Sequence, residues 1–514
     1  MKYKQRYWLR AIVQTDRDDG RDSRQYRNVP YRVEVDFDRI FAERGISGRL
    51  DRHSVCVVKA GDNDCEAGLR ETHYYLSEEW LCGNKGTIHW LIDEIGEEPL
   101  EYRIYYDSTD SGPFAPPAYI GLVGDGDALR FNDGRAHPLH VGLAANPIAI
   151  DWDGDGAIDI ISPQIYSHAA GSPWHVVRFF RNEGSNERPL FGEGIALTAD
   201  IAGRREPIRT GYCIELCDMN GDGLPDLLNC AYTDADNRLQ VFVNTGERDD
   251  ITGLPRLRLD DTVPLGLSGQ IICIRAIDLH GDGRISLLVG YITQAQYADI
   301  DDPLWFTATD EQKRQAQWPR WYYRSYIALY ENNAPAAGQL SFAPPVTLLA
   351  DDGLPISYYT CANFEVVNHT GGMAFDLLVN SHAPNLHEGY LTLAYYKHAG
   401  EGRRPVFAKA GTIGGLADRN SLIVRQCRNA AFDGLLVVPG ASGGKIVHYR
   451  CVGTNEAGLP QYEREGYVQQ RNAYVHAHAG YAQGQAIDDD GDGDWDIVAG
   501  CETGFVTRIG NSGT

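Results

Sequence analysis

Short runs of apolar residues recur along residues 128–514, and pairs of these runs flank loops rich in aspartate and glycine. A third run follows each loop and often ends in asparagine, and a fourth follows a proline or glycine turn. Apolar runs of this length, bounded by turn residues, predict β-strands. Repeats of four short strands are typical of the blades of a β-propeller.

Six repeats can be counted from the loops and their flanking strands. The loops at 151–159, 218–226 and 488–496 have the sequences DWDGDGAID, DMNGDGLPD and DDDGDGDWD, and that at 278–286, DLHGDGRIS, is a diverged copy. Two more repeats, at 362–379 and 421–438, keep the strands but have lost the acidic loop. The sequence therefore predicts an all-β fold, with a β-propeller of six blades by count, or of seven if the natural chain continues past Thr514.

The ends of the repeat region predict how the propeller closes. The last repeat stops after its third strand, and residues 128–131 stand where other repeats have a fourth strand. An N-terminal strand that completed the C-terminal blade would remove an exposed sheet edge. One repeat carries an insertion at 294–324, rich in Trp and Tyr, which we expect to form a wall or lid beside the propeller.

The region before the repeats predicts a second domain. Residues 29–107 alternate in the manner of strands and are interpreted as a small β-sandwich. One short helix is expected at 38–44, with Asp38 as its N-cap. Residues 1–28 are taken as an N-terminal arm, and 108–127, rich in Pro, Gly and Ser, as the linker to the propeller at 128–514.

The acidic loops have the ligand chemistry of calcium sites. Carboxylates alternate with glycines, which let the backbone fold around an ion, and Ca²⁺ prefers hard oxygen ligands. An EF-hand is excluded, because Ser162, Asn229 and Ala499 stand where it needs a bidentate glutamate. The predicted ligands of three structural sites are Asp151, Asp153, Asp155 and Asp159; Asp218, Asn220, Asp222 and Asp226; and Asp488, Asp490, Asp492 and Asp496.

A fourth site at Asp278 and Asp282 is doubtful, because His280 and Ser286 are poor calcium ligands. The alternative for every loop is a plain Asp/Gly hairpin turn without metal. Against that alternative, so many clustered carboxylates would repel one another if no cation were bound.

These DxDGDGxxD loops between short strands resemble the FG-GAP or VCBS-type calcium-binding β-propeller repeats over about 128–514. The resemblance implies the fold and calcium binding. The family includes lectins, adhesion heads and polysaccharide lyases, so the resemblance leaves the activity open.

By the same resemblance, a ligand would bind on the rim opposite the acidic loops. Tyr and Trp faces stack on sugar rings, while Arg and His bind carboxylates. The expected binding residues there are Tyr166, His175, Tyr212, Trp305, Trp321, Arg324, His387, Arg419, His476 and His478. For each His, the alternative is a rim residue that caps a turn, and the aromatic residues of the insertion could pack on their own blade.

The leading functional hypothesis is a lyase that cleaves a uronic-acid-containing glycan by β-elimination. That reaction needs a base, an acid and a group that neutralises the carboxylate. We assign His168 or His382 as base, Tyr232 or Tyr291 as acid, and Arg209 as carboxylate clamp. His476 and His478, which alternate in a strand, are the alternative pair.

Two other classes stay open. A non-catalytic lectin-like or adhesion propeller should repeat equivalent pockets, whereas the rim connections here differ between repeats, which favours one specialised site. A glycoside hydrolase would use two carboxylates. The candidates for these are Asp234, Asp236, Glu388 and Glu502.

Charge and composition limit the partners. The 47 Lys and Arg against 71 Asp and Glu give a net charge of −24, which disfavours nucleic acid and anionic membranes. No apolar run approaches the roughly 20 residues of a membrane-spanning helix. The expected partner is an acidic or neutral glycan, and the sequence does not define the oligomeric state.

The N-terminus has charges and a Trp where a signal peptide would be apolar, and the 11 cysteines are odd in number and scattered. Both favour the cytoplasm, whereas calcium binding, or a leader already removed, would favour secretion.

Overall fold

The computed structural model describes most of the chain. The described residues are 5–14, 27–60, 70–72, 74–94, 99–109, 130–131, 135–142, 145–164, 175–230, 238–267, 269–296, 321–359, 363–369, 371–380, 393–400, 404–414, 416, 422–439, 444–471, 473–474, 483–488, 491, 496–500 and 506–510. Their elements are strands apart from one short α-helix and one 3-10 helix, so the expected all-β class is confirmed. None of the helices in this part of the chain is long and apolar enough to span a membrane.

The N-terminal domain consists of two facing antiparallel sheets. One has the order β1 (Tyr7–Val13), β7 (Leu100–Thr109), β3 (Arg49–Lys59) and β4 (Arg70–Glu71), and the other β2 (Arg27–Asp36), β6 (Lys85–Glu94) and β5 (Tyr74–Leu76). Alternate residues of both sheets meet in one apolar core around Trp80, Trp90 and Tyr106. Residues 29–107, interpreted as a small β-sandwich, supply most of these strands, and β1, which lies within the stretch taken as an arm, pairs with β7 along its whole length.

Helix α1 (Phe37–Arg44) forms where a helix was expected, but its N-cap differs. Asp36, not Asp38, is the cap: its carboxylate accepts from the backbone N–H of Arg39. Asp38 instead accepts from the side-chain amide of Asn84. The helix starts earlier because Phe37 and Phe41 both reach the sandwich core.

The repeat region begins with five sheets in chain order, whose strands pair antiparallel except for two short strands, Thr198–Ile201 and Leu349–Ala350, which pair in parallel with a neighbour. The first sheet contains β10 (Ile148–Ile150), β11 (Asp159–Gln164), β12 (Val176–Phe180) and β13 (Ile195–Ala196), and the second contains β16 (Ile214–Cys217), β17 (Asp226–Asn229), β18 (Arg238–Arg248) and β19 (Pro255–Pro264), with β14 (Thr198–Ile201) and β15 (Arg204–Pro207) at its edge. The third sheet contains β20 (Gln270–Asp278), β21 (Ile285–Gln296), β22 (Trp321–Tyr330), β23 (Val346–Thr347) and β25 (Ser357–Tyr359). The fourth sheet contains β26 (Asn363–Val367), β27 (Asp376–Asn380), β28 (Leu393–His398) and β29 (Val406–Ile413), with β24 (Leu349–Ala350), and the fifth contains β30 (Leu422–Arg428), β31 (Asp433–Pro439), β32 (Val447–Thr454) and β33 (Pro460–Tyr467).

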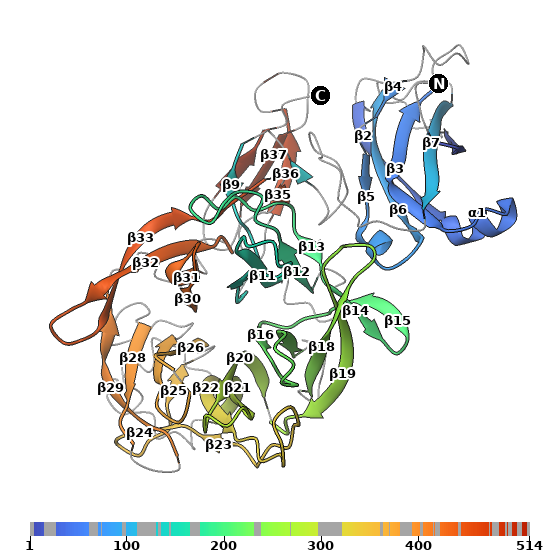
Figure 1. The fold of residues 1–514 in the computed structure, drawn as a ribbon. Coiled ribbons are helices and arrows are strands. Elements are labelled where there is room, and N and C mark those ends of the chain that lie inside the picture. Colours follow the sequence, from blue (N-terminus) through green and yellow to red (C-terminus); the bar gives the residue numbers. More distant parts are fainter. Residues whose placement is uncertain are drawn as a thin grey trace.

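The five sheets succeed one another around a common centre (Figure 1). Apolar clusters join the first sheet to the second, the second to the third, the third to the fourth and the fourth to the fifth. Another cluster joins the fifth sheet back to the first, with Phe180 and Phe191 from one side and Phe432 and Leu436 from the other. We call this arrangement the ring.

The segment just before the first sheet makes the contact that returns to the fifth. The Leu139 N–H donates to Val468 O (2.7 Å), the Ile446 N–H donates to Leu139 O (3.0 Å), and the Val141 N–H donates to Gly444 O (2.9 Å). Two short pairs extend this contact, β9 (His137–Pro138) with β34 (Gln469–Gln470) and β8 (Arg130–Phe131) with β35 (Ala473–Tyr474). The N-terminal strand therefore pairs with the chain that follows the fifth sheet, instead of completing the last repeat.

The sixth repeat forms a separate three-stranded sheet, β36 (Gln483–Ile487), β37 (Asp496–Gly500) and β38 (Val506–Ile509). In Figure 1 it lies farther from the centre than the other five. None of its residues belongs to the five clusters that join the sheets in the described part of the chain. The six repeats of the sequence thus correspond to five sheets in the ring and one beside it, because residues 137–141 occupy the edge to which a sixth sheet would pack.

Candidate functional site

The first acidic loop, residues 151–159, forms a tight turn between β10 and β11. Both carboxylate oxygens of Asp151 accept backbone hydrogen bonds, from Gly154 (2.8 Å) and Gly156 (3.1 Å). These two glycines have φ of 73° and 90°, values that other residues rarely adopt. The DxDGDG pattern therefore has a local cause: the aspartate closes the turn, and the glycines permit it.

Three carboxylates of this loop lie together. Ligand oxygens of Asp151, Asp153 and Asp159 are within 4.8 Å of one another, and Asp159 is fully buried. Burial, with the nearby charges of Asp153 and Asp155, raises the pKa of Asp159 to about 7. Backbone N–H groups of Trp152 and Asn182 donate to Asp159 and partly offset this effect. The oxygen donors and their crowding fit a hard divalent cation.

Two arginines also contact this loop. Arg181 Nη1 lies 2.7 Å from Asp153 Oδ2, and Arg248 Nη2 donates to the backbone oxygen of Asp153 at 2.7 Å. Despite Arg181, burial raises the pKa of Asp153. The Arg181 side chain is 42% exposed, so solvent reaches this ion pair.

The second loop repeats the turn with a different acidic cluster. Gly221 and Gly223 donate to Asp218 at 2.7 and 2.8 Å, as their counterparts do to Asp151. The Asn220 amide donates to Asp222 (2.8 Å), which ties up one carboxylate oxygen within the loop. In the described part of the chain, three His, Cys, Asp or Glu ligand atoms come this close only in the first loop.

The acidic loops at 488–496 (the third) and 278–286 (the fourth) differ further from the first loop. Asp490 and Asp492 lie outside the described residues, Asp488 accepts from Gly491 (2.7 Å), and Asp496 contacts Arg508 (3.3 Å). In the fourth loop, Arg284 pairs with Asp282 at 2.5 Å and lowers its carboxyl pKa. The Arg284 guanidinium thus neutralises Asp282, in the loop whose calcium site the sequence leaves doubtful.

The last polar residue of the loop, an aspartate in three sheets and a serine in one, has a structural role that sequence reasoning missed. It accepts a backbone N–H from the third strand or from the residues just after it, in four sheets: Asp159 from Asn182 (2.8 Å), Asp226 from Asn244 (2.8 Å), Ser286 from Asn332 (3.1 Å) and Asp376 from His398 (2.9 Å). The recurrent asparagine after the third strand was the signal. This contact forms in loops with and without a carboxylate cluster, so it does not depend on metal.

Most of the predicted rim residues lie outside the described residues. These are His168, His382, Tyr232, Tyr166, Trp305, His387, Arg419, His476 and His478, with the hydrolase candidates Asp234, Asp236, Glu388 and Glu502. Trp321 and Arg324 lie on β22, opposite Gln296 and Thr293 of β21. The predicted insertion therefore begins and ends as an extension of the β21–β22 hairpin.

The four remaining candidates do not form one site. His175 is buried and its backbone oxygen accepts from Thr210 (3.1 Å), while the side chain of Arg209 is exposed. Tyr212 packs against the cluster between the third and fourth sheets. The ring of Tyr291 lies 5.8 Å from that of Tyr326, and burial raises its pKa.

Buried charges from four sheets meet at the centre of the ring. Glu215 on β16 accepts from both terminal nitrogens of Arg425 on β30 (2.6 and 2.7 Å). Arg275 on β20 lies 3.0 Å from Glu365 on β26 and 3.8 Å from Glu215. Burial lowers the pKa of Arg425, but Glu215 and Glu365 outweigh it and raise that pKa. This axial cluster is neutral in sum, so at this level the centre is not the basic channel that an anionic substrate would need.

A cavity lies away from this axial cluster, between the N-terminal domain and the ring. It measures about 870 Å³ and we call it the interdomain cavity. Its lining comes mainly from β2, β5, β6 and the 3-10 helix η3 (Glu78–Leu81) on one side, and from Val176, Arg205, Glu206, Pro207 and Arg209 on the other. Arg209, the predicted carboxylate clamp, thus faces the N-terminal domain.

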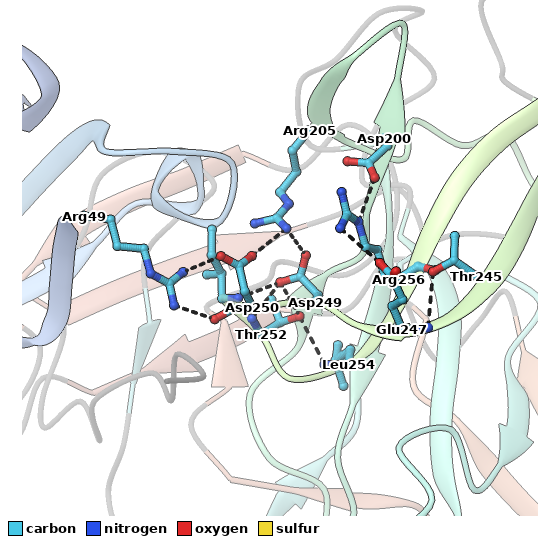
Figure 2. A network of polar contacts seen from close by, with 11 residues as sticks. Arg49, Asp200, Arg205, Thr245, Glu247, Asp249, Asp250, Thr252, Leu254 and Arg256 are labelled. Atoms are coloured by element: carbon cyan, nitrogen blue, oxygen red, sulfur yellow. Dashed lines mark hydrogen bonds and ion pairs between the residues drawn. The ribbon is translucent and has the colours of Figure 1, made fainter. Parts of the chain in front are cut away.

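Polar contacts hold the two sides of this cavity together (Figure 2). Arg49 of the N-terminal domain contacts Asp250 at 3.0 Å, and Arg205 contacts both Asp249 (2.6 Å) and Asp250 (2.8 Å). The Asp249 carboxylate also accepts the backbone N–H groups of Ile251 and Thr252. The turn after β18 is therefore the docking point for the N-terminal domain.

Comparisons with known proteins give no close relative. No family model matches the chain, and no curated protein matches it. A GH43 β-xylosidase/α-arabinofuranosidase from a compost microbial metagenome, solved with xylotriose in a calcium-free form, is 16% identical over 64% of this chain and 98% of that chain, with a TM-score of 0.36. The Tc holotoxin pore of Photorhabdus luminescens is 11% identical over 85% of this chain and 18% of that one, with a TM-score of 0.22. Similarities this weak identify neither the activity nor the family of the chain.

Proposed function

We propose that this chain is a calcium-binding protein in which five blades form a β-propeller of the FG-GAP/VCBS kind. The observation that supports calcium most directly is the group of three carboxylates, Asp151, Asp153 and Asp159, with oxygens within 4.8 Å of one another. Ca²⁺ takes oxygen ligands at about 2.3–2.6 Å, and its charge would keep all three groups ionised. Its role would be to stiffen the turn between β10 and β11.

Calcium titration of chelator-treated protein will detect a site that Asp153→Asn weakens at least about tenfold, or about 1.4 kcal/mol. The substitution removes one charged ligand but keeps the shape of the side chain. Isothermal titration calorimetry measures the affinity, and the rise in melting temperature on adding calcium checks it.

Asp282→Asn in the loop at 278–286 is the matched control, because in the described part of the chain that loop does not bring three carboxylates together. It should leave calcium affinity unchanged. Equal affinities of Asp153→Asn and the parent protein would remove the first loop as a calcium site, and no heat of binding with any variant would refute the proposal.

As a second function we propose action on a uronic-acid-containing glycan by β-elimination. Its support is Arg209, an exposed guanidinium that lines a cavity large enough for a ligand. In this mechanism His168 or His382 takes the α-proton, Tyr232 protonates the leaving oxygen, and Arg209 neutralises the uronate. Tyr291, the other predicted acid, is left out because it packs against Tyr326 and does not line the cavity that contains Arg209.

An ultraviolet absorbance screen for unsaturated uronate, run with calcium on a panel of acidic polysaccharides, is expected to show product with one substrate. His168→Ala or His382→Ala should abolish the signal. Saturable binding without product would favour the lectin-like alternative, and new reducing ends without unsaturated product would favour a hydrolase. Either outcome contradicts the lyase.

A further inference from the structure

We propose that the interdomain cavity binds a neutral polyhydroxylated ligand such as a short oligosaccharide. The proposal does not rest on the second function: it uses none of the histidines assigned there, and it places a neutral ligand instead of a uronate beside Arg209. At about 870 Å³ the cavity falls within the roughly 300–1,000 Å³ of small-molecule sites, which often form between domains.

One wall is the polar face of the sheet formed by β2, β6 and β5. Strand alternation sends Val35, Ile88 and Trp90 into the sandwich core. The other face presents two rows of polar side chains across the three strands: Arg32, His89 and Tyr75, and next to them Glu34, Thr87 and Ser77. All six residues line the cavity, so this face is turned toward the ring.

The opposite wall presents Arg209 from a fixed backbone. Ile208 and Thr210 on either side are buried (0% and 1% exposed), so the side chain between them points outward. The side-chain amide of Asn229 donates to the Arg209 carbonyl at 2.7 Å. The guanidinium therefore projects from a position set by the second sheet.

The floor is rigid. Arg178, only 1% exposed, forms an ion pair with Glu78 of η3. Next to it, Leu81 packs with Val176, Ala196 and Ile251 of the ring. A cavity whose walls are already held together loses little conformational entropy when a ligand binds.

The charges of the lining select the ligand class. The cations are Arg32, Lys85, Arg205 and Arg209, and the anions are Glu34, Asp38, Glu78, Glu79 and Glu206. An anion or a cation alone would meet groups of its own sign on the same walls. A hydroxyl both donates and accepts hydrogen bonds, so a row of sugar hydroxyls can satisfy guanidinium donors and carboxylate acceptors together.

Calorimetric titration with cellotriose, maltotriose and mannotriose, with trigalacturonate as the acidic counterpart, tests the proposal. We expect saturable binding of at least one neutral trisaccharide, weakened at least about tenfold by Arg209→Ala and by Glu34→Gln. Both positions are exposed, so neither variant should unfold the protein, and circular dichroism verifies this. Arg188→Ala and Glu456→Gln, exposed and outside the lining, are the matched controls and should bind normally.

Three results would overturn the proposal. They are selective binding of trigalacturonate, binding that neither Arg209→Ala nor Glu34→Gln weakens, and no binding of any trisaccharide. Binding of a neutral trisaccharide by a protein that produces no unsaturated uronate would reject the lyase and leave this site standing, so the two proposals fail separately.

Discussion

Replacing Glu215 by glutamine will destabilise the ring by about 3–5 kcal/mol, the usual cost of removing one partner from a buried ion pair. Glu215 is 4% exposed and accepts two hydrogen bonds from Arg425. Glutamine keeps the shape but loses the charge, and one of its two polar ends is a donor that would face the guanidinium. Arg425 would then retain the weaker contact with Glu365, at 3.9 Å.

Urea unfolding followed by tryptophan fluorescence measures this loss. Glu463→Gln is the matched control, because Glu463 is exposed and pairs with Arg450 at 3.5 Å. A surface pair of this kind contributes less than about 1 kcal/mol. If Glu215→Gln costs no more than this control, the axial cluster does not stabilise the ring.

A double variant separates charge from packing. Changing both Glu215 and Arg425 to methionine removes one cation and one anion and leaves the Arg275–Glu365 pair in place. Apolar replacement of a complete buried pair is often neutral or stabilising. We therefore expect the double variant to lose less stability than Glu215→Gln alone, measured by the same unfolding transition.

The sequence repeats predicted the strands of the ring, because each strand and turn is marked by residues that lie close together in the chain. Aspartate and glycine mark the turn after the first strand, and an asparagine marks the end of the third. The number of sheets in the ring was not predictable in this way. It depends on whether residues 137–141 or the sixth sheet pack against the fifth, and that choice is made by contacts between distant segments.

The axial cluster shows a signal that was present in the sequence but not used. Glu215, Arg275, Glu365 and Arg425 occupy one equivalent position in the first strands of four successive sheets. Charges of alternating sign at a buried repeat position predict pairing across the axis. A repeat-by-repeat alignment would therefore have predicted paired charges at the centre of the ring.

Of the two candidate sites, the sequence predicted the acidic loop but not the interdomain cavity, because only the loop is formed by residues close together in the chain. The first acidic loop is local, and oxygens of three of its four predicted ligands, Asp151, Asp153 and Asp159, lie close together, whereas Asp155 is not in this group. The interdomain cavity is not local, since its lining runs from Arg32 to Arg209. Arg209 was singled out for its charge, but its neighbours on the N-terminal domain were assigned no function.

Replacing Leu81 by aspartate will separate the N-terminal domain from the ring. Leu81 is 4% exposed and packs against Val176, Ala196 and Ile251. Losing a buried leucine costs about 2–5 kcal/mol, and burying an unpaired carboxylate in its place adds to this. Small-angle X-ray scattering should show a larger radius of gyration, and trisaccharide binding in the interdomain cavity should be lost with it.

Ile12→Asp is the matched control, because Ile12 lies in the same domain, on β1, and is 49% exposed. It should leave both the radius and the binding unchanged. The ion pair between Arg49 and Asp250 remains in Leu81→Asp, and because the Asp250 side chain is 63% exposed we expect it to hold the domain only loosely. An unchanged radius for Leu81→Asp would mean that the buried pair of Arg178 with Glu78 is sufficient for docking, and would shift the main contribution from apolar packing to that ion pair.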